Sequence, residues 1–129
     1  MIVVDASVLI AHLDERDALH RRAEDALLEA AEQTLACSPI TLAEVLVGPA
    51  RRSRLDEARA AIAELELDVI PLGDDAPVRL ATLRAASGLK LPDCCVLLAA
   101  SAAAAARVLT FDDALAREVH RLGLGLGRS

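Results

Sequence analysis

The sequence contains almost no aromatic residues: one Phe, and no Tyr or Trp, among 129 residues. This scarcity removes one common means of binding nucleic acids, the stacking of bases on exposed aromatic rings. Hydrophobic residues nevertheless make up 54% of the chain. The core must therefore consist of Leu, Val, Ile and Ala packed between helices, and the length predicts one domain, residues 1–129, without room for a second core.

Cysteine is also scarce, and its spacing fits no metal site. The chain has three Cys and three His residues. No C-x-x-C pair occurs, and the histidines do not complete a zinc-binding pattern. We interpret the cysteines, two of which are the adjacent Cys94 and Cys95, as small buried hydrophobic residues of a protein in the reducing cytoplasm.

The sequence has neither a membrane segment nor an excess of positive charge. Its longest apolar run ends at Arg107, short of the about 18 residues that a membrane span needs, and the N-terminal MIVVDAS lacks the basic region of an export signal. The net charge of −6 argues against general electrostatic binding of nucleic acids. Contact with RNA or DNA would need bound cations or a local basic patch. Arg51, Arg52 and Arg54 form one such patch, and a solvated helix start explains it at least as well.

Short apolar runs alternate with helical patterns along the chain. The runs do not alternate polar with apolar residues, which is typical of buried parallel strands, and they lie at residues 2–4, 34–38, 67–70, 107–110 and, more weakly, 122–124. Helical spacing of apolar residues predicts helices at 6–13, 18–32, 39–47, 54–66, 76–87, 93–106 and 113–121. This order predicts an α/β protein, a three-layer α/β/α sandwich with a mostly parallel sheet of four to five strands. We expect the last residues, GLGRS, to fray.

Three aspartates lie at predicted strand ends or helix starts. Asp5 follows the first strand, Asp112 follows the run at 107–110 with one residue between, and Asp93 opens the apolar helix. Ligands of an open parallel sheet bind outside the carboxyl ends of its strands, where the strand order reverses. If the two strands are neighbours there, Asp5 and Asp112 face one crevice. For each Asp taken alone, capping of a helix is the better explanation, because Asp is a favoured N-cap.

Glu44 favours a shared function for these acids. It lies more than a turn inside the helix that begins at Ser38-Pro39, and its neighbours three and four residues away are mostly apolar. A carboxylate on such a face needs a partner or a metal ion. A capping box of Thr41 and Glu44 is the competing explanation, and the earlier helix start disfavours it.

Clustered carboxylates predict a metal site. They repel one another, and without a cation some of them would be protonated at neutral pH. Their oxygen atoms suit Mg²⁺ or Mn²⁺, and such ions can activate water and stabilise the charge on a phosphodiester under attack. This chemistry needs no nucleophilic side chain, in agreement with a chain that has no Ser-His-Asp set and no Gly-rich phosphate loop.

Four segments resemble PIN-domain ribonucleases and, within that group, the VapC-type toxins of prokaryotic toxin–antitoxin modules. They are VVDASVLIAHL, SPITLAEVLVG, LKLPDCCVLLAASA and VLTFDDAL, in family order and spacing, and the resemblance covers essentially the whole chain. It implies a catalytic, metal-binding quartet with two supporting hydroxyl residues: Asp5, Glu44, Asp93 and Asp112, with Ser7 and Thr110. Ser7 would steady the pocket, and Thr110 would contact metal or water. We interpret Asp113 as the cap of the last helix.

The resemblance also implies an activity and partners. The activity is a Mg²⁺- or Mn²⁺-dependent ribonuclease toxin in which metal-activated water cleaves RNA, leaving 5′-phosphate and 3′-hydroxyl ends. The partners are the RNA substrate, a cognate antitoxin that covers the site, and a second copy of the chain in a homodimer. Arg51, Arg52 and Arg54 would contact substrate phosphates.

Two other classes of protein stay open. A receiver domain also clusters acids at strand ends, but it needs paired acids after the first strand and a Lys after the fifth, and the chain lacks both. A non-catalytic PIN scaffold that only binds a partner is the second, and an intact quartet disfavours it.

Overall fold

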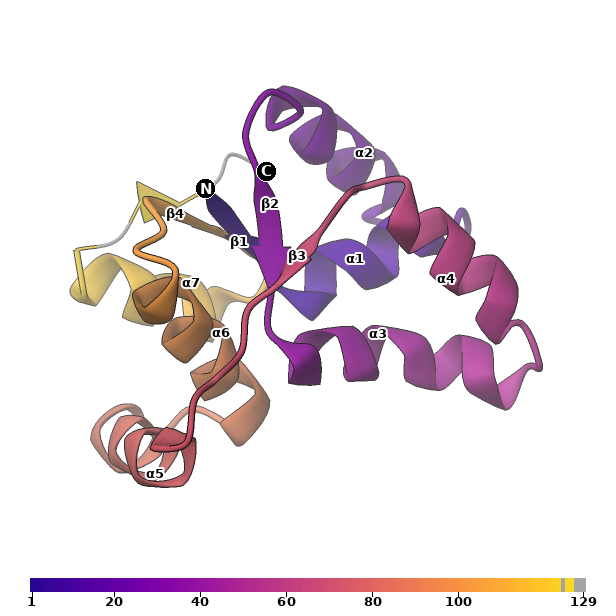
Figure 1. Ribbon diagram of the computed structural model, residues 1–129. Coiled ribbons are helices and arrows are strands. Elements are labelled where there is room, and N and C mark those ends of the chain that lie inside the picture. Colours follow the sequence, from indigo (N-terminus) through magenta and orange to yellow (C-terminus); the bar gives the residue numbers. More distant parts are fainter. Residues whose placement is uncertain (124, 127–129) are drawn as a thin grey trace.

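The computed structural model describes residues 1–123 and 125–126. The strands are β1 (Ile2–Val4), β2 (Leu35–Cys37), β3 (Asp68–Val69), β4 (Arg107–Leu109) and β5 (Gly125–Leu126). The helices are α1 (Ala6–Leu13), α2 (His20–Glu29), α3 (Pro39–Arg51), α4 (Leu55–Ala63), α5 (Ala76–Ser87), α6 (Leu91–Ala102) and α7 (Asp113–Arg121). Figure 1 shows the sheet in the middle, with α1 and α2 on one side and α6 and α7 on the other, so the predicted three-layer α/β/α sandwich is confirmed.

The sheet is parallel throughout, and its strand order reverses at β1. The order is β3-β2-β1-β4-β5, so the chain builds outward from β1 to β3 and then returns to the other side of β1. Val3 of β1 pairs in register with Ala36 of β2 on one side and with Val108 of β4 on the other. The carboxyl ends of β1 and β4 therefore meet at the switch point, where ligands of such sheets bind.

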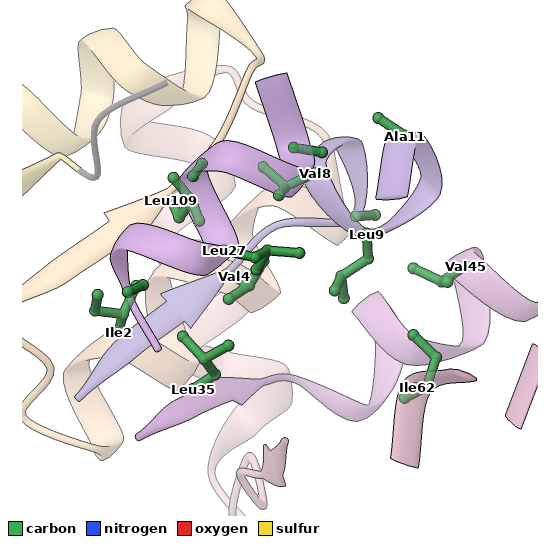
Figure 2. Close-up of a cluster of buried hydrophobic side chains, with 14 residues drawn as sticks. Ile2, Val4, Val8, Leu9, Ala11, Leu27, Leu35, Val45, Ile62 and Leu109 are labelled. Carbon is green, nitrogen blue, oxygen red and sulfur yellow. The ribbon is translucent and has the colours of Figure 1, made fainter. Parts of the chain in front are cut away.

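The core has two parts, one on each face of the sheet. Alternate residues of β1 point to opposite faces, so Ile2 and Val4 enter one cluster while Val3 enters the other. Figure 2 shows the first cluster, in which Val4 meets Leu9 of α1 and Leu27 of α2. The side chains of this cluster are aliphatic, and the burial of such side chains is the main favourable term in folding.

The second cluster contains several residues of α6. All its residues from Cys94 to Ala100 are buried, and all three cysteines are buried and unbridged, as predicted. Burial raises the pKa of Cys37 to about 11, which keeps this thiol protonated and inert. Within the described residues, no single helix is both long and apolar enough to span a membrane.

Several predicted boundaries are wrong by a few residues. The helix predicted at 93–106 is α6, which begins two residues earlier because Pro92 occupies its first turn and Lys90 is the N-cap. The helix predicted at 39–47 continues through Gly48 and Pro49 to Arg51, so these two residues do not end it, although both are unfavourable inside helices.

The predicted strand at 122–124 is also wrong. Leu122 is the C-cap of α7, Gly123 adopts the left-handed φ of 76° that ends a helix, and residue 124 lies outside the described residues. The fifth strand is instead Gly125–Leu126, at the start of the GLGRS segment that was expected to fray. Residues 127–129 of that segment lie outside the described residues.

Candidate active site

Asp5 and Asp112 come from the two strands that meet at the switch point. Asp5 directly follows β1, and its backbone N–H donates to the carbonyl oxygen of Leu109, at the end of β4, at 2.9 Å. The Asp5 side chain is 5% exposed. Asp5 is in the N-cap position of α1, but its carboxylate makes no capping hydrogen bond. Capping therefore does not explain why a buried carboxylate stands there.

Two hydroxyl groups hold the same oxygen of the Asp5 carboxylate. Ser7 Oγ donates to Asp5 Oδ2 at 2.8 Å, and Thr110 Oγ1 donates to that oxygen at 2.7 Å. In turn, Ser7 Oγ accepts from the N–H of Phe111, and Thr110 Oγ1 accepts from the N–H of Asp112, both at 3.0 Å. Charge-assisted hydrogen bonds of this kind are strong. They fix the Asp5 rotamer. Because the Thr110 hydroxyl is already hydrogen-bonded to protein groups, Thr110 serves to position Asp5.

Asp112 lies beside this network and also begins α7. Its Oδ1 accepts from the N–H of Leu115 at 2.8 Å, which makes Asp112 the N-cap and Asp113 the first helical residue. The interpretation of Asp113 as the cap is therefore wrong. The extended backbone of Asp112, with φ −85° and ψ 119°, turns its carboxylate over the first turn of α7. The capping explanation holds for Asp112, whose side chain is also exposed to solvent.

Asp93 is inside the first turn of α6, and the N-cap of that helix is Lys90, not Asp93. Its pKa is raised first by partial burial and then by the negative charges of Asp5 and Asp112, while Lys90 acts in the opposite direction. Charges influence a pKa in this way only when they lie nearby. Asp93 therefore belongs to the same group of carboxylates as the two strand-end residues.

Glu44 reaches this group from α3. Ser38 caps α3 by accepting from the N–H of Thr41 at 2.9 Å, so Thr41 is already helical and no Thr41–Glu44 capping box exists. The pKa of Glu44 is raised by partial burial and then by Asp5 and Asp93. Glu44 is thus influenced by Asp5 and Asp93, and Asp93 by Asp5 and Asp112, which links the four carboxylates at the switch point.

The expectation that Glu44 lies on an apolar, unsolvated face is wrong. Its side chain is exposed, and so are those of Ile40 and Val47. The buried line of α3 runs through Thr41 and Val45, one position away from Glu44. Glu44 therefore lies at the solvent edge of the carboxylate group, where solutes can reach it.

The carboxylates suit a hydrated cation better than a closed metal cage. Among residues 1–123 and 125–126, no three acidic, His or Cys side chains lie close enough together to hold a metal ion by themselves. Mg²⁺ usually keeps several water ligands and uses one or two carboxylates, which Asp5, Asp93, Asp112 and Glu44 can supply. Burial is the first cause of the raised pKa values of Glu44 and Asp93, and the neighbouring carboxylates raise them further; a divalent ion would offset this second, electrostatic part.

A cleft of about 780 Å³ extends from Glu44 between α1, α3 and α4. Arg52 and Arg54 line it, whereas Arg51 is exposed and does not line it. Arg54 lies 3.5 Å from Glu57 in an exposed ion pair. Arg16 also lines the cleft, and sequence reasoning missed it because it lies in a loop distant from the arginine cluster.

Comparison with known proteins gives a consistent picture. The family model described as PIN domain matches residues 2–119. No curated protein matches the chain. Among solved structures, a toxin–antitoxin complex from Klebsiella pneumoniae is 29% identical, with a TM-score of 0.72 over 87% of each chain.

Two further structures show the fold at lower identity. VapC20 from Mycobacterium tuberculosis, a Sarcin-Ricin loop cleaving toxin, is 19% identical, with a TM-score of 0.76 over 92% of this chain and 95% of that one. VapBC2 from Rickettsia felis, bound to a DNA fragment from its promoter, is 18% identical, with a TM-score of 0.70 over 98% of this chain and 97% of that one.

Proposed function

The chain belongs to the PIN domain family, and on that premise we propose that it is the toxin of a toxin–antitoxin module and hydrolyses RNA phosphodiester bonds. The observation that carries the proposal is the convergence of Asp5, Glu44, Asp93 and Asp112 at the switch point of a parallel sheet. The resemblance to the Klebsiella pneumoniae toxin–antitoxin complex and to a toxin that cleaves the Sarcin-Ricin loop supports both parts of it.

The chain's own residues divide the work. Asp5, held by Ser7 and Thr110, is the rigid anchor of the site, and Asp93, Asp112 and Glu44 complete the set of oxygen ligands. A bound Mg²⁺ or Mn²⁺ ion supplies activation of water and neutralisation of the charge that develops on the phosphodiester. Arg52 and Arg54, which line the adjoining cleft, contact substrate phosphates. Arg51 contributes less, because it lies outside that cleft.

The partners follow from the same proposal. A cognate antitoxin covers the carboxylate site and restrains cleavage, and the toxin forms a homodimer that pairs again through the antitoxin. The module acts in the cytoplasm, where its RNA substrates are. Similarity to toxin–antitoxin structures over 87% or more of this chain supports the antitoxin as a partner.

Cleavage of RNA by the purified protein tests the proposal. Wild type, Asp93→Asn and Asp113→Asn would be incubated with total RNA in MgCl₂, MnCl₂ or EDTA, and the fragment ends would be mapped. We expect cleavage with Mg²⁺ or Mn²⁺ but not with EDTA, giving 5′-phosphate ends. Asp93→Asn should be inactive. Asp113→Asn is the matched control, since Asp113, like Asp93, is an acid in the first turn of a helix but lies outside the quartet.

Two outcomes would contradict the proposal. Equal cleavage by wild type and Asp93→Asn would mean that the quartet is not the active site. No cleavage by wild type under any of these conditions would favour a non-catalytic scaffold that only binds a partner.

A further inference from the structure

The residue that carries the single aromatic side chain of the protein adjoins the carboxylate site. Phe111 is the only Phe in a chain without Tyr or Trp, and it separates Thr110 from Asp112. Its backbone N–H donates to Ser7 Oγ, and Ser7 in turn holds Asp5. The ring is half-buried against the core cluster that contains Val4 and Leu9. The backbone that carries Phe111 is therefore tied into the site.

Arg22 of α2 stacks on this ring. Its guanidinium carbon is 4.7 Å from the ring centroid, which is within the range of a cation–π interaction. In the described part of the chain, Arg22 makes no ion pair or side-chain hydrogen bond. Asp25, three residues along α2 and in reach for an i,i+3 pair, also forms no ion pair with any described residue. The guanidinium thus lies on the aromatic face although a carboxylate is available nearby.

Stacking leaves the donors of Arg22 available. A guanidinium that lies over a ring uses its face, while its five N–H donors point outward in its own plane. Those donors match the geometry of two phosphate oxygens. Because the Arg22 side chain is exposed, a phosphate from solvent can reach them.

The charge of the protein makes such a cation useful. The chain has a net charge of −6, and the quartet adds local repulsion toward a polyanion. Arg52 and Arg54 line a cleft bounded by α1, α3 and α4. Arg22 comes from α2 and lies on the Thr110–Asp112 segment, so it supplies positive charge from a different element.

We propose that Arg22 is a substrate-positioning residue: the ring of Phe111 holds its guanidinium beside the carboxylate site, where it binds a phosphate of the RNA. This inference rests on the proposed ribonuclease function and adds a binding determinant to it. The simpler explanation is that Arg22 only shields the ring from water. The two explanations differ in what the positive charge does.

The test compares variants that separate the effect of the positive charge of Arg22 from the effect of covering the Phe111 ring. Arg22→Met keeps an apolar stem over the ring and removes the charge, Arg22→Lys keeps the charge, and Arg21→Met removes the same charge from the neighbouring exposed position on α2. The probe is a short fluorescein-labelled single-stranded RNA of mixed sequence. Its binding would be followed by anisotropy in EDTA, which prevents cleavage, from about 50 to about 200 mM NaCl.

We expect Arg22→Met to weaken binding about fivefold to tenfold and to lower the salt slope by about 0.7, the value for one contact with a single strand. Arg22→Lys should recover part of the affinity, and Arg21→Met should stay close to wild type. In the cleavage assay, Arg22→Met should raise KM and leave the rate at saturating RNA nearly unchanged. Its effect should shrink in a Phe111→Leu background, because the ring no longer holds the guanidinium.

Equal binding and equal salt slopes for Arg22→Met and Arg21→Met would overturn the inference, and so would a wild-type protein that does not bind the probe at low salt. Neither result bears on whether the protein cleaves RNA. Loss of the proposed function would appear separately, as absence of cleavage by wild type. Both arginine variants are at exposed positions, and matching melting temperatures would verify that they fold.

Discussion

Thr110 Oγ1 donates a hydrogen bond to Asp5 Oδ2 at 2.7 Å, and this bond joins the ends of β4 and β1 across 105 positions of the chain. Thr110 also accepts from the N–H of Asp112. One hydroxyl group therefore positions two members of the quartet. Its geometry depends on the parallel pairing of β1 with β4, so the fold and the site are coupled at this residue.

Thr110→Val should impair the site while keeping the side-chain shape. The change removes a donor to the buried Asp5 carboxylate and an acceptor for the Asp112 N–H, and leaving buried polar groups unpaired costs about 1–3 kcal/mol. Loss of a group that orients a metal ligand typically lowers affinity or activity about 10- to 100-fold. Urea unfolding and RNA cleavage would measure the two effects. Thr110→Ser, which keeps the hydroxyl, is the control. Full activity in Thr110→Val would contradict the positioning role.

The strand arrangement behind this bond could be predicted from the sequence. Residues 2–4 and 107–110 are short apolar runs, and parallel strands bring their carboxyl ends to one edge, so the proximity of Asp5 and Asp112 follows from topology. The observed strand order has β1 and β4 as neighbours. The cap of α7 could not be assigned in the same way. Asp112 and Asp113 are both good caps, and only the backbone angles at the helix start distinguish them.

Two other features depend on tertiary contacts that leave no local pattern. Whether Glu44 is exposed depends on which side of α3 packs on the sheet. The sequence pattern indicates the wrong side, because Ile40 and Val47 are apolar and yet exposed. The stacking of Arg22 on Phe111 joins α2 to the segment after β4. The presence of a lone aromatic residue next to Asp112 was the one signal that could have drawn attention to it.

Divalent metal should stabilise the free protein through the quartet. An ion that binds the folded state relieves carboxylate repulsion, and at ten times its Kd it adds about 1.4 kcal/mol of stability. Thermal melts in EDTA, MgCl₂ and MnCl₂ would measure the shift. We expect an increase in Tm for wild type and for Asp113→Asn. The increase should disappear in the Asp5→Asn, Asp93→Asn double variant, and an equal shift there would rule these residues out as ligands.

Glu44→Gln should abolish RNA cleavage without lowering stability. Gln keeps the side-chain volume and a similar helix propensity, and it removes a charge that Asp5 and Asp93 disfavour. Cleavage rate and melting temperature would be measured together. Glu57→Gln is the matched control, since Glu57 is another exposed glutamate that lines the same cleft. A fully active Glu44→Gln protein would show that Glu44 is not a ligand.

Without metal, the quartet should make stability fall as the pH rises. The folded-state pKa values of Glu44 and Asp93 are raised above their ordinary values of 4.5 and 3.8. Between the ordinary and the raised values, the folded state binds more protons than the unfolded state, so these two groups cost stability once the pH passes both.

The Glu44→Gln, Asp93→Asn double variant removes this cost. In EDTA, its stability relative to wild type should increase from about pH 4 to about pH 7, and the gain should stay within about 1 kcal/mol for Glu44, because solvent screens that exposed group. Urea unfolding at a series of pH values would measure it. A stability difference that does not change with pH would contradict the assigned pKa shifts.

The arginines past α3 should affect RNA binding and not the chemical step. Arg52 and Arg54 line the cleft that includes Glu44, and Arg51 does not. An Arg52→Ala, Arg54→Ala double variant should therefore show nearly all the effect of a triple variant in which Arg51 is also changed to Ala. We expect weaker RNA binding and a salt slope lower by about 1.4, the value for two contacts with a single strand. The rate at saturating RNA should change little, and Arg51→Ala alone should resemble wild type. If RNA affinity at low salt is unchanged while antitoxin affinity falls, these side chains bind the antitoxin, because a loss of phosphate contacts must weaken binding most at low salt.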